Sequence, residues 1–345
     1  MMAIQDRETL FREAEKKRGR SKFLEAVPLY KRVKSLSKGD NELILACLMS
    51  LGDCYRMTGD YGKALLSYEE ACGMAEQHDD EATATDALVG LGLTFRATGD
   101  HRAAIEILKK VEKIYKRWGD IQGLAFTLWS RGGAYRIQGS LGRALTTFNE
   151  ALLLFRKLGE KAGVGYCLCG LGGASRMAGD TSASLRYYTR ANRSFVALKD
   201  TFGVAYSYCG LANAKRMKGD YKAAFDYFRK AKSNYKKIGD RVSYAYTLWG
   251  EGTAFKMIGN LKKADSDFRE AERLFKQTGD ERGLVYGDLA LGEIAYLTGR
   301  QQRADTLFER ALTRAEAFSF GAELKYCKRL LRAAETGRGF PFNLP

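Results

Sequence analysis

Apolar residues recur along this chain at the spacing of a helix face, and a glycine followed by a short polar residue interrupts the pattern at regular intervals. Residues 121–160 show the unit clearly. A first helix is predicted from residues four, four and three positions apart, namely Leu124, Leu128, Gly132 and Tyr135. After the Gly139-Ser140 break, a second helix is predicted from a stripe of small and aromatic residues, namely Ala144, Phe148, Ala151 and Phe155.

This two-helix unit repeats every forty residues. The segment Leu51–Ala71 returns as Leu91–Val111 and then five more times, with no insertion or deletion. The glycine between the two helices forms one column, Gly59, Gly99, Gly139, Gly179, Gly219, Gly259 and Gly299. A fixed period of this length is typical of a solenoid, in which each repeat packs only on its neighbours. We therefore expect one elongated unit in place of several globular domains.

Short polar residues after the glycines can cap the second helices. This column contains Asp60, Asp100, Ser140, Asp180, Asp220 and Asn260. Arg300 breaks the column, so the last of these turns should be the least well capped. In the apolar column of the first helices, Arg131 and Glu251 replace leucine, which predicts partly exposed positions there.

The repeated residues resemble the signature of the tetratricopeptide (TPR) repeat, on the evidence of Leu51, Gly52, Tyr55, Ala64, Tyr68 and Ala71. The forty-residue step resembles the longer subtype of Pins/LGN-type adaptors, with kinesin light chains and bacterial Rap regulators as more distant relatives. The resemblance implies an all-α fold, a right-handed α-solenoid of about eight TPR helix pairs plus a C-terminal capping helix. Repeats of this kind serve many systems, so the resemblance does not specify a partner.

The repeat pattern divides the chain into four parts. We expect an N-terminal capping TPR in residues 1–40, seven forty-residue repeats in 41–320, a capping helix in 321–336 and a flexible tail in 337–345. The tail holds two of the three prolines and two phenylalanines, so it cannot be a helix. It is either a frayed end or a segment that docks in its own groove or in that of a neighbouring molecule, which would give self-association.

The composition shows that the chain is strongly basic. The formal net charge of +16 and the pI of about 9.4 favour an acidic partner, whether a peptide, a nucleic acid or an anionic membrane surface. The alternative is that lysines solvate the outer faces of the solenoid. Seven cysteines inside helical patterns indicate free thiols in a reducing compartment, so we predict a cytoplasmic protein.

Candidate chemistry for an enzyme is sparse. Only two histidines, His78 and His101, occur, and they lie far apart. No phosphate-binding glycine motif, metal-ligand spacing or nucleophile–base pair is present, and no apolar run approaches the length of a membrane span. We therefore predict a protein without cofactor or metal that is not an enzyme.

In a TPR superhelix, by the same resemblance, the first helix of each pair lines the concave groove. One column there is basic in six repeats and ends at Tyr296; its members are Arg56, Arg96, Arg136, Arg176, Arg216 and Lys256. We predict that this column binds acidic groups of a partner, because arginine bonds carboxylates in a bidentate manner. The alternative is that each cation interacts with the last carbonyls and the dipole of its own helix.

Aromatic residues of the same helices are further candidates for the groove, namely Trp129, Trp249, Tyr166, Tyr206, Tyr246 and Tyr286. They can equally pack between repeats or in the core. The leading hypothesis is a non-catalytic scaffold or adaptor that binds an acidic extended peptide in this basic, aromatic-lined groove. An RNA-binding or other nucleic-acid-binding array and a regulatory module that senses a small ligand are the alternatives, and a self-assembling scaffold is compatible with each.

Overall fold

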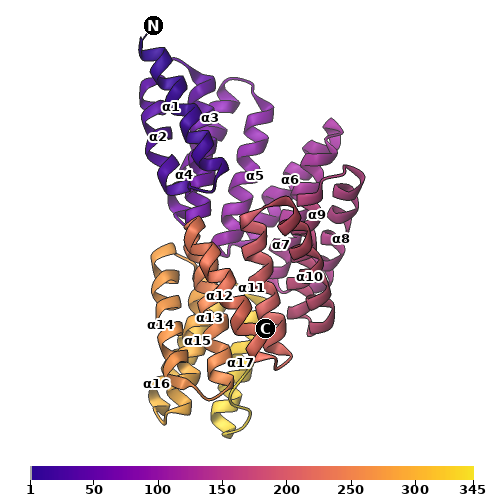
Figure 1. Cartoon of the computed structure of the whole chain (residues 1–345), viewed down its shortest axis with the longest axis vertical. Coiled ribbons are helices and arrows are strands. Elements are labelled where there is room, and N and C mark those ends of the chain that lie inside the picture. Colours follow the sequence, from indigo (N-terminus) through magenta and orange to yellow (C-terminus); the bar gives the residue numbers. More distant parts are fainter. Residues whose placement is uncertain (1) are drawn as a thin grey trace.

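The computed structural model describes the backbone of residues 2–345 and the side chains of residues 6–345, so residue 1 of the expected N-terminal cap lies outside it. The described chain forms seventeen α-helices and no strand (Figure 1), which confirms the all-α solenoid. Their bounds are α1 Met2–Gly19, α2 Phe23–Leu36, α3 Asn41–Thr58, α4 Tyr61–Gln77, α5 Glu81–Thr98, α6 His101–Trp118, α7 Ile121–Gln138, α8 Leu141–Lys157, α9 Lys161–Met177, α10 Thr181–Leu198, α11 Thr201–Met217, α12 Tyr221–Ile238, α13 Arg241–Met257, α14 Leu261–Thr278, α15 Glu281–Leu297, α16 Gln301–Ala317 and α17 Gly321–Thr336. They make eight consecutive pairs followed by α17.

The polar residues after the glycines cap four of the second helices as predicted. Asp100, Asp180, Asp220 and Asn260 each accept a hydrogen bond from the backbone N–H three residues later. The prediction is wrong for Asp60 and Ser140, which make no side-chain cap bond. The Asp60 carboxylate binds Lys63, and the Ser140 hydroxyl donates to the side chain of Gln138, so both side chains have other partners. Arg300 makes no side-chain cap bond.

Glycines of the inner helices form flat surfaces on which the aromatic rings of the outer helices pack. The ring of Phe148 lies against Gly132 of its own repeat and Gly170 of the next, and Tyr188 lies in the same way against Gly172 and Gly210. A methyl group at any of these four glycines would overlap the ring. The missing side chains therefore let three helices meet at each ring.

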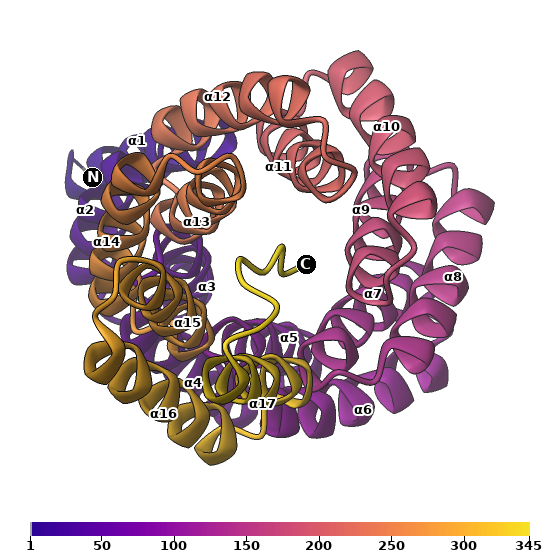
Figure 2. The same cartoon turned by 90° about the horizontal axis from the view of Figure 1, so that it is seen from below.

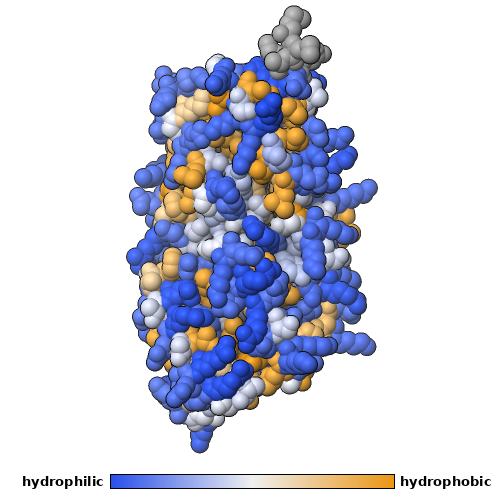
Figure 3. Space-filling view, turned by 90° about the vertical axis from the view of Figure 1, so that its left-hand side faces the viewer, coloured by the Kyte–Doolittle hydropathy of each residue, from blue (hydrophilic) through white to orange (hydrophobic). Residues whose placement is uncertain are grey.

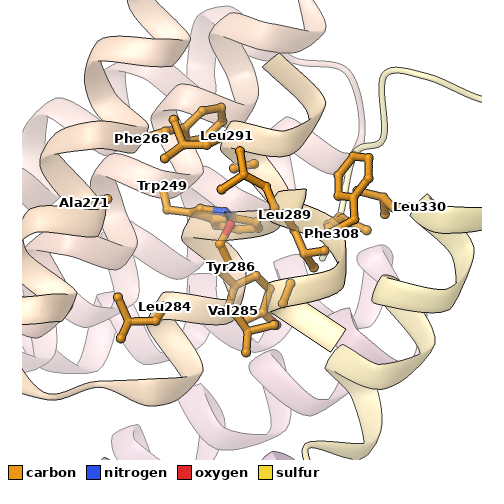
Figure 4. Close-up of a cluster of buried hydrophobic side chains, with 14 of the residues drawn as sticks. Trp249, Phe268, Ala271, Leu284, Val285, Tyr286, Leu289, Leu291, Phe308 and Leu330 are labelled. Atoms are coloured by element: carbon orange, nitrogen blue, oxygen red, sulfur yellow. Dashed lines mark hydrogen bonds between the residues drawn. The ribbon is translucent and has the colours of Figure 1, made fainter. Parts of the chain in front are cut away.

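The core is continuous across repeats. Figure 4 shows one part of it, where Trp249 and Tyr286 of the inner helices α13 and α15 pack with Phe268 and Phe308 of α14 and α16. Some polar residues of this region are buried together with a partner. Glu251, predicted to be partly exposed, is in fact buried because its carboxylate binds Lys232.

The solenoid turns until its second half contacts its first half. The guanidinium of Arg241 at the start of α13 donates two hydrogen bonds, of 2.9 and 2.8 Å, to the carbonyl oxygen of Thr58 at the end of α3. The Gly139 turn after α7 lies against the backbone of Gly321 at the start of α17. The odd-numbered helices from α3 to α15 consequently face the inside of the superhelix, and the even-numbered helices surround them (Figure 2). We call the space inside the odd-numbered helices the channel; it contains the cavity described below.

The outer surface is largely hydrophilic on the side drawn in Figure 3, where hydrophobic residues are scattered in small groups. The seven cysteines are free thiols, and five of them are buried. Within residues 2–345, no helix has the length and apolar character required to cross a bilayer. The channel is therefore the feature that distinguishes this molecule, and the basic column lies along it.

Candidate functional site

The centre of the channel contains a cavity of about 280 Å³. Its walls come from the inner helices of six consecutive repeats, α5, α7, α9, α11, α13 and α15, with single residues of the outer helices α4, α10 and α12 and of the chain terminus. Three members of the basic column, Arg96, Arg136 and Arg176, line it together with the last residue, Pro345.

These three arginines lack an acidic partner. The guanidinium of Arg96 lies 5.0 Å from the ring centroid of Trp129 and donates to the carbonyl of Ser130 at 3.4 Å. The Arg136 guanidinium reaches the sulfur of Met177 at 3.9 Å, and the Nε of Arg176 is buried without a hydrogen-bond partner. No carboxylate of the described residues forms an ion pair with any of the three. We call Arg96, Arg136 and Arg176 the arginine triad.

The electrostatics of the triad favour an anion. Burial holds the pKa of Arg96 below its ordinary value, and the neighbouring Arg56 and Arg136 add to this effect. A lowered pKa means that the protein environment disfavours the positive charge. Arginine stays protonated nonetheless, so an incoming carboxylate or phosphate would relieve this cost.

The other members of the column have partners. Arg56 pairs with Asp53 of its own helix at 3.1 Å and does not line the cavity. Arg216 is fully buried and binds Asn213 as well as the C-terminal tail, while Lys256 forms a buried ion pair with Glu293 of the next repeat. The alternative role for these cations was a bond to the last carbonyls of their own helices. No hydrogen bond described for their side chains goes to such a carbonyl.

For the five arginines of the column, the residue three positions earlier on the same helix decides whether the guanidinium has a partner on its own helix, whereas Lys256 finds its partner, Glu293, in the next repeat. Asp53 and Asn213 supply an oxygen to Arg56 and Arg216. Leucine or glycine occupies the equivalent place before each member of the triad, at Leu93, Gly133 and Gly173. Sequence reasoning missed this column, although Asp53, Asn213 and Glu293 stand out in it among residues that carry neither a charge nor an amide, and these three were the signal.

The C-terminal tail lies inside the channel (Figure 2), where it follows the column from its last member toward the triad. The ring of Phe340 stacks on Tyr296 at 4.2 Å, the Nζ of Lys256 donates to the carbonyl of Phe342 at 2.9 Å, and Nη2 of Arg216 donates to that of Leu344 at 2.7 Å. Phe342 and Leu344 are buried. The segment 337–345, expected to be flexible, thus corresponds in this structure to the docked alternative.

Three of the four predicted tyrosines connect neighbouring repeats. The hydroxyl of Tyr166 donates to Asp200 at 2.8 Å and that of Tyr246 to Asp280 at 3.3 Å, and both aspartates cap the inner helix of the next repeat. Tyr286 donates to Glu323 of α17 at 2.8 Å. Tyr206, Tyr246 and Tyr286 line the cavity, and of these Tyr206 has no such bond among the described residues. These three contacts therefore correspond to packing between repeats, which was the alternative to a role of the tyrosines in the groove.

The two tryptophans occupy equivalent places three repeats apart. The indole nitrogens of Trp129 and Trp249 each donate, at 3.2 Å, to the carbonyl of a tyrosine in the next inner helix, Tyr166 and Tyr286 respectively. Arg96 lies over the first ring, and Arg216 lies 5.6 Å from the centre of the second. Both rings are held in the channel wall by these hydrogen bonds, and each orients the arginine that lies beside it.

Comparison with known protein families matches most of this chain to models of the tetratricopeptide repeat. One model covers residues 12–77, 123–193 and 203–277, and a second covers residues 86–116. No curated protein sequence matches the chain.

Several solved structures have a similar fold at low sequence identity. A Rap protein in complex with competence and sporulation factor is 14% identical with a TM-score of 0.62, over 96% of this chain and 98% of that one. The Rap conjugation gene regulator of plasmid pLS20, in complex with the Phr* peptide, is 14% identical with a TM-score of 0.65, over 90% and 95%. NprR in complex with its cognate peptide NprX is 16% identical with a TM-score of 0.61, over 85% and 88%. At these identities the likeness concerns the fold alone.

Proposed function

This chain belongs to the tetratricopeptide repeat family, and from that premise we propose that it is a non-catalytic protein-interaction module whose channel binds an acidic, extended segment of another protein. The observation that carries the proposal is the arginine triad, three cations that line one cavity and have no carboxylate partner. Unpaired buried charge is costly, so a site of this kind gains stability when an anion enters it.

The shape of the channel supports an extended peptide. Inner helices of adjacent repeats lie on the order of 10 Å apart, and an extended chain advances roughly 3.3 Å per residue. An acidic side chain at about every third residue would therefore meet successive members of the triad. Two solved structures of similar fold are complexes with a peptide, Phr* in one case and NprX in the other, and a comparable mode of binding is part of this proposal.

The test is a titration of the full chain with a fluorescein-labelled peptide of about ten residues that carries aspartate at every third position. We expect saturable binding. Replacing Arg136 and Arg176 by glutamate should weaken it at least about tenfold, which corresponds to about 1.4 kcal/mol. The matched control is the pair Arg186→Glu and Arg190→Glu, which makes the same change of net charge on the exposed face of α10.

The control separates a site from the general effect of the +16 charge. Equal loss of affinity in both double variants, or no loss in either, would contradict binding at the triad. Single-stranded RNA is titrated in parallel at about 50 and 200 mM salt, because phosphate contacts make affinity steeply salt-dependent. Binding of RNA with no binding of the peptide would favour the nucleic-acid alternative.

A further inference from the structure

The tail is held in the channel by specific polar contacts and not only by apolar packing. Both backbone groups of Phe342 are bonded, since its N–H donates to Glu293 Oε1 at 2.7 Å and its carbonyl accepts from Lys256. The side chain of Asn343 exchanges two hydrogen bonds with Arg216, one with the guanidinium and one with the backbone carbonyl. Arg216 also binds the carbonyl of Leu344. The contacts alternate along an extended chain, as in a peptide held by a receptor.

The groups that hold the tail are charged and buried. Arg216 is fully buried, and the Lys256–Glu293 pair is almost completely shielded from solvent. Burying such charges is unfavourable unless all their hydrogen-bonding positions are satisfied. One Glu293 oxygen binds Lys256 and the other binds the tail amide, so the tail completes the pair. These three residues belong to α11, α13 and α15, which are rigid parts of the solenoid.

The tail is joined to the solenoid by a short, exposed connection. Gly337, Arg338 and Gly339 are all exposed, and both glycines have positive φ, 69° and 97°. Glycine adopts such backbone conformations at little cost, so this connection can change direction without disturbing α17. The site itself has flat surfaces for the first and third residues of the segment: the ring of Tyr296 stacks on Phe340, and the guanidinium of Arg329 lies 4.6 Å from the ring of Phe342.

We propose that Arg216, Lys256, Glu293 and Tyr296 form a peptide-binding site, separate from the arginine triad, for an extended segment with the chemistry Phe-Pro-Phe-Asn-Leu, and that residues 340–344 fill it as an exchangeable internal ligand. A peptide of the same chemistry supplied by another molecule occupies the site when the tail leaves. Asn343 gives the site its specificity, because the side-chain amide carries an acceptor oxygen and a donor nitrogen on separate atoms, one for the Arg216 guanidinium and one for the Arg216 carbonyl.

The test uses the full chain with two substitutions in the tail, Phe342→Ser and Asn343→Ala, which leave the channel wall intact. A fluorescein-labelled peptide with the sequence of residues 338–345 is titrated into this release variant and into the natural chain. We expect at least tenfold tighter binding by the release variant. Adding Arg216→Gln to it, or replacing the asparagine of the peptide by alanine, should weaken binding at least fivefold.

Circular dichroism verifies that each variant is folded, and Asn343→Ala alone serves as a milder release variant. Absence of binding by a folded release variant overturns the proposal, and so does equal binding by the natural chain. The natural chain also gives a measurement that needs no substitution. Excess peptide should accelerate amide exchange at Phe342, and an unchanged exchange rate at saturating peptide contradicts an exchangeable tail.

The aspartate-bearing peptide is titrated into the same release variant. Binding of the tail peptide alone would contradict the proposed function and support this inference, and binding of the acidic peptide alone would do the reverse. The two sites are therefore judged independently.

Discussion

At the scale of single residues, the chemistry of the channel depends on the position three residues before each arginine of the column. An aspartate there gives Arg56 an ion pair, and an asparagine gives Arg216 a neutral partner, whereas Gly133 and Gly173 leave Arg136 and Arg176 without one. The arginines alone therefore do not define an anion site. What defines it is an arginine whose neighbour on the same helix face carries no acceptor.

An acceptor introduced three residues before an arginine of the triad should pair with that arginine. The site should then bind an anion less well, although all three arginines are still present. We expect Gly173→Asp to reproduce the arrangement of Asp53 and Arg56 at Arg176 and to weaken binding of the aspartate-bearing peptide about tenfold, roughly 1.4 kcal/mol. Gly173→Asn is the matched control, because it has the same shape without the charge. Equal effects of the two substitutions in the fluorescence titration would show that the loss is steric and not electrostatic.

A second residue-scale prediction concerns Asp267 on α14. Burial and then the nearby carboxylate of Glu251 raise the pKa of Asp267 to about 7, and one of its carboxylate oxygens is buried without a hydrogen-bond partner. A raised pKa means that the folded state holds a proton between about pH 4 and 7 that the unfolded state releases. The contribution of this group to stability is consequently lost as the pH rises through 7.

We therefore expect Asp267→Asn to stabilise the protein at pH 8 and to have little effect at pH 4.5. The gain should be on the order of 1 kcal/mol, since partial exposure of the group reduces the effect. Urea unfolding at the two pH values measures it. Asp226→Asn, on an exposed part of α12, is the control for the loss of one negative charge. The same stabilisation at both pH values would contradict the titration of Asp267.

At the scale of helices, the aromatic ring between three helices is the unit of packing. Gly210→Ala would place a methyl group inside the ring of Tyr188, which cannot move because it also contacts Gly172. We expect a loss of about 2 kcal/mol in urea unfolding, the usual cost of overpacking. Gly73→Ala is the control, since nothing lies within 4 Å of that position in α4, and it should stabilise by about 0.5–1 kcal/mol. Destabilisation by both would indicate a different cause.

The helices and their order were predictable from the sequence because the signals are local. The glycine turns and the small and aromatic columns each lie within one repeat, and the structure has the eight pairs and the final helix that they predict. The fate of each side chain was less predictable, because it depends on residues in other repeats. Tyr166 binds an aspartate 34 positions away, and Arg216 binds an asparagine 127 positions away. A periodic pattern carries no information about such contacts.

At the scale of the whole molecule, the repeat length does not determine the biological role. The resemblance to Pins/LGN-type adaptors stays a prediction, while solved structures with the same overall fold include Rap proteins and NprR. In this chain the two halves of the solenoid are in contact. Arg241 bonds the end of α3, Arg102 donates to Ser319 at 2.8 Å, and Phe320 packs on Gly99. These contacts fix the width of the channel.

The last prediction follows from that closure. Gly321 has no room for a side chain, because a Cβ atom there would lie 2.5 Å from the carbonyl oxygen of Gln138. Gly321→Leu combined with Arg241→Ala should therefore separate the two halves while leaving each repeat intact. A compact chain of this length has a radius of gyration of about 20 Å, and we expect small-angle X-ray scattering to show a rise of roughly a tenth.

Helix content should remain unchanged in this variant, because neighbouring repeats still stabilise one another. Arg273→Ala, which removes only a pairing with Glu270 on the exposed face of α14, is the control and should leave the radius of gyration as it is. Both peptides should bind the opened variant more weakly, since the triad lies on helices that precede α11 and the tail site on helices that follow α10. An unchanged radius of gyration in a folded variant would show that packing between adjacent repeats, and not the contact between the two halves, sets the shape of the channel.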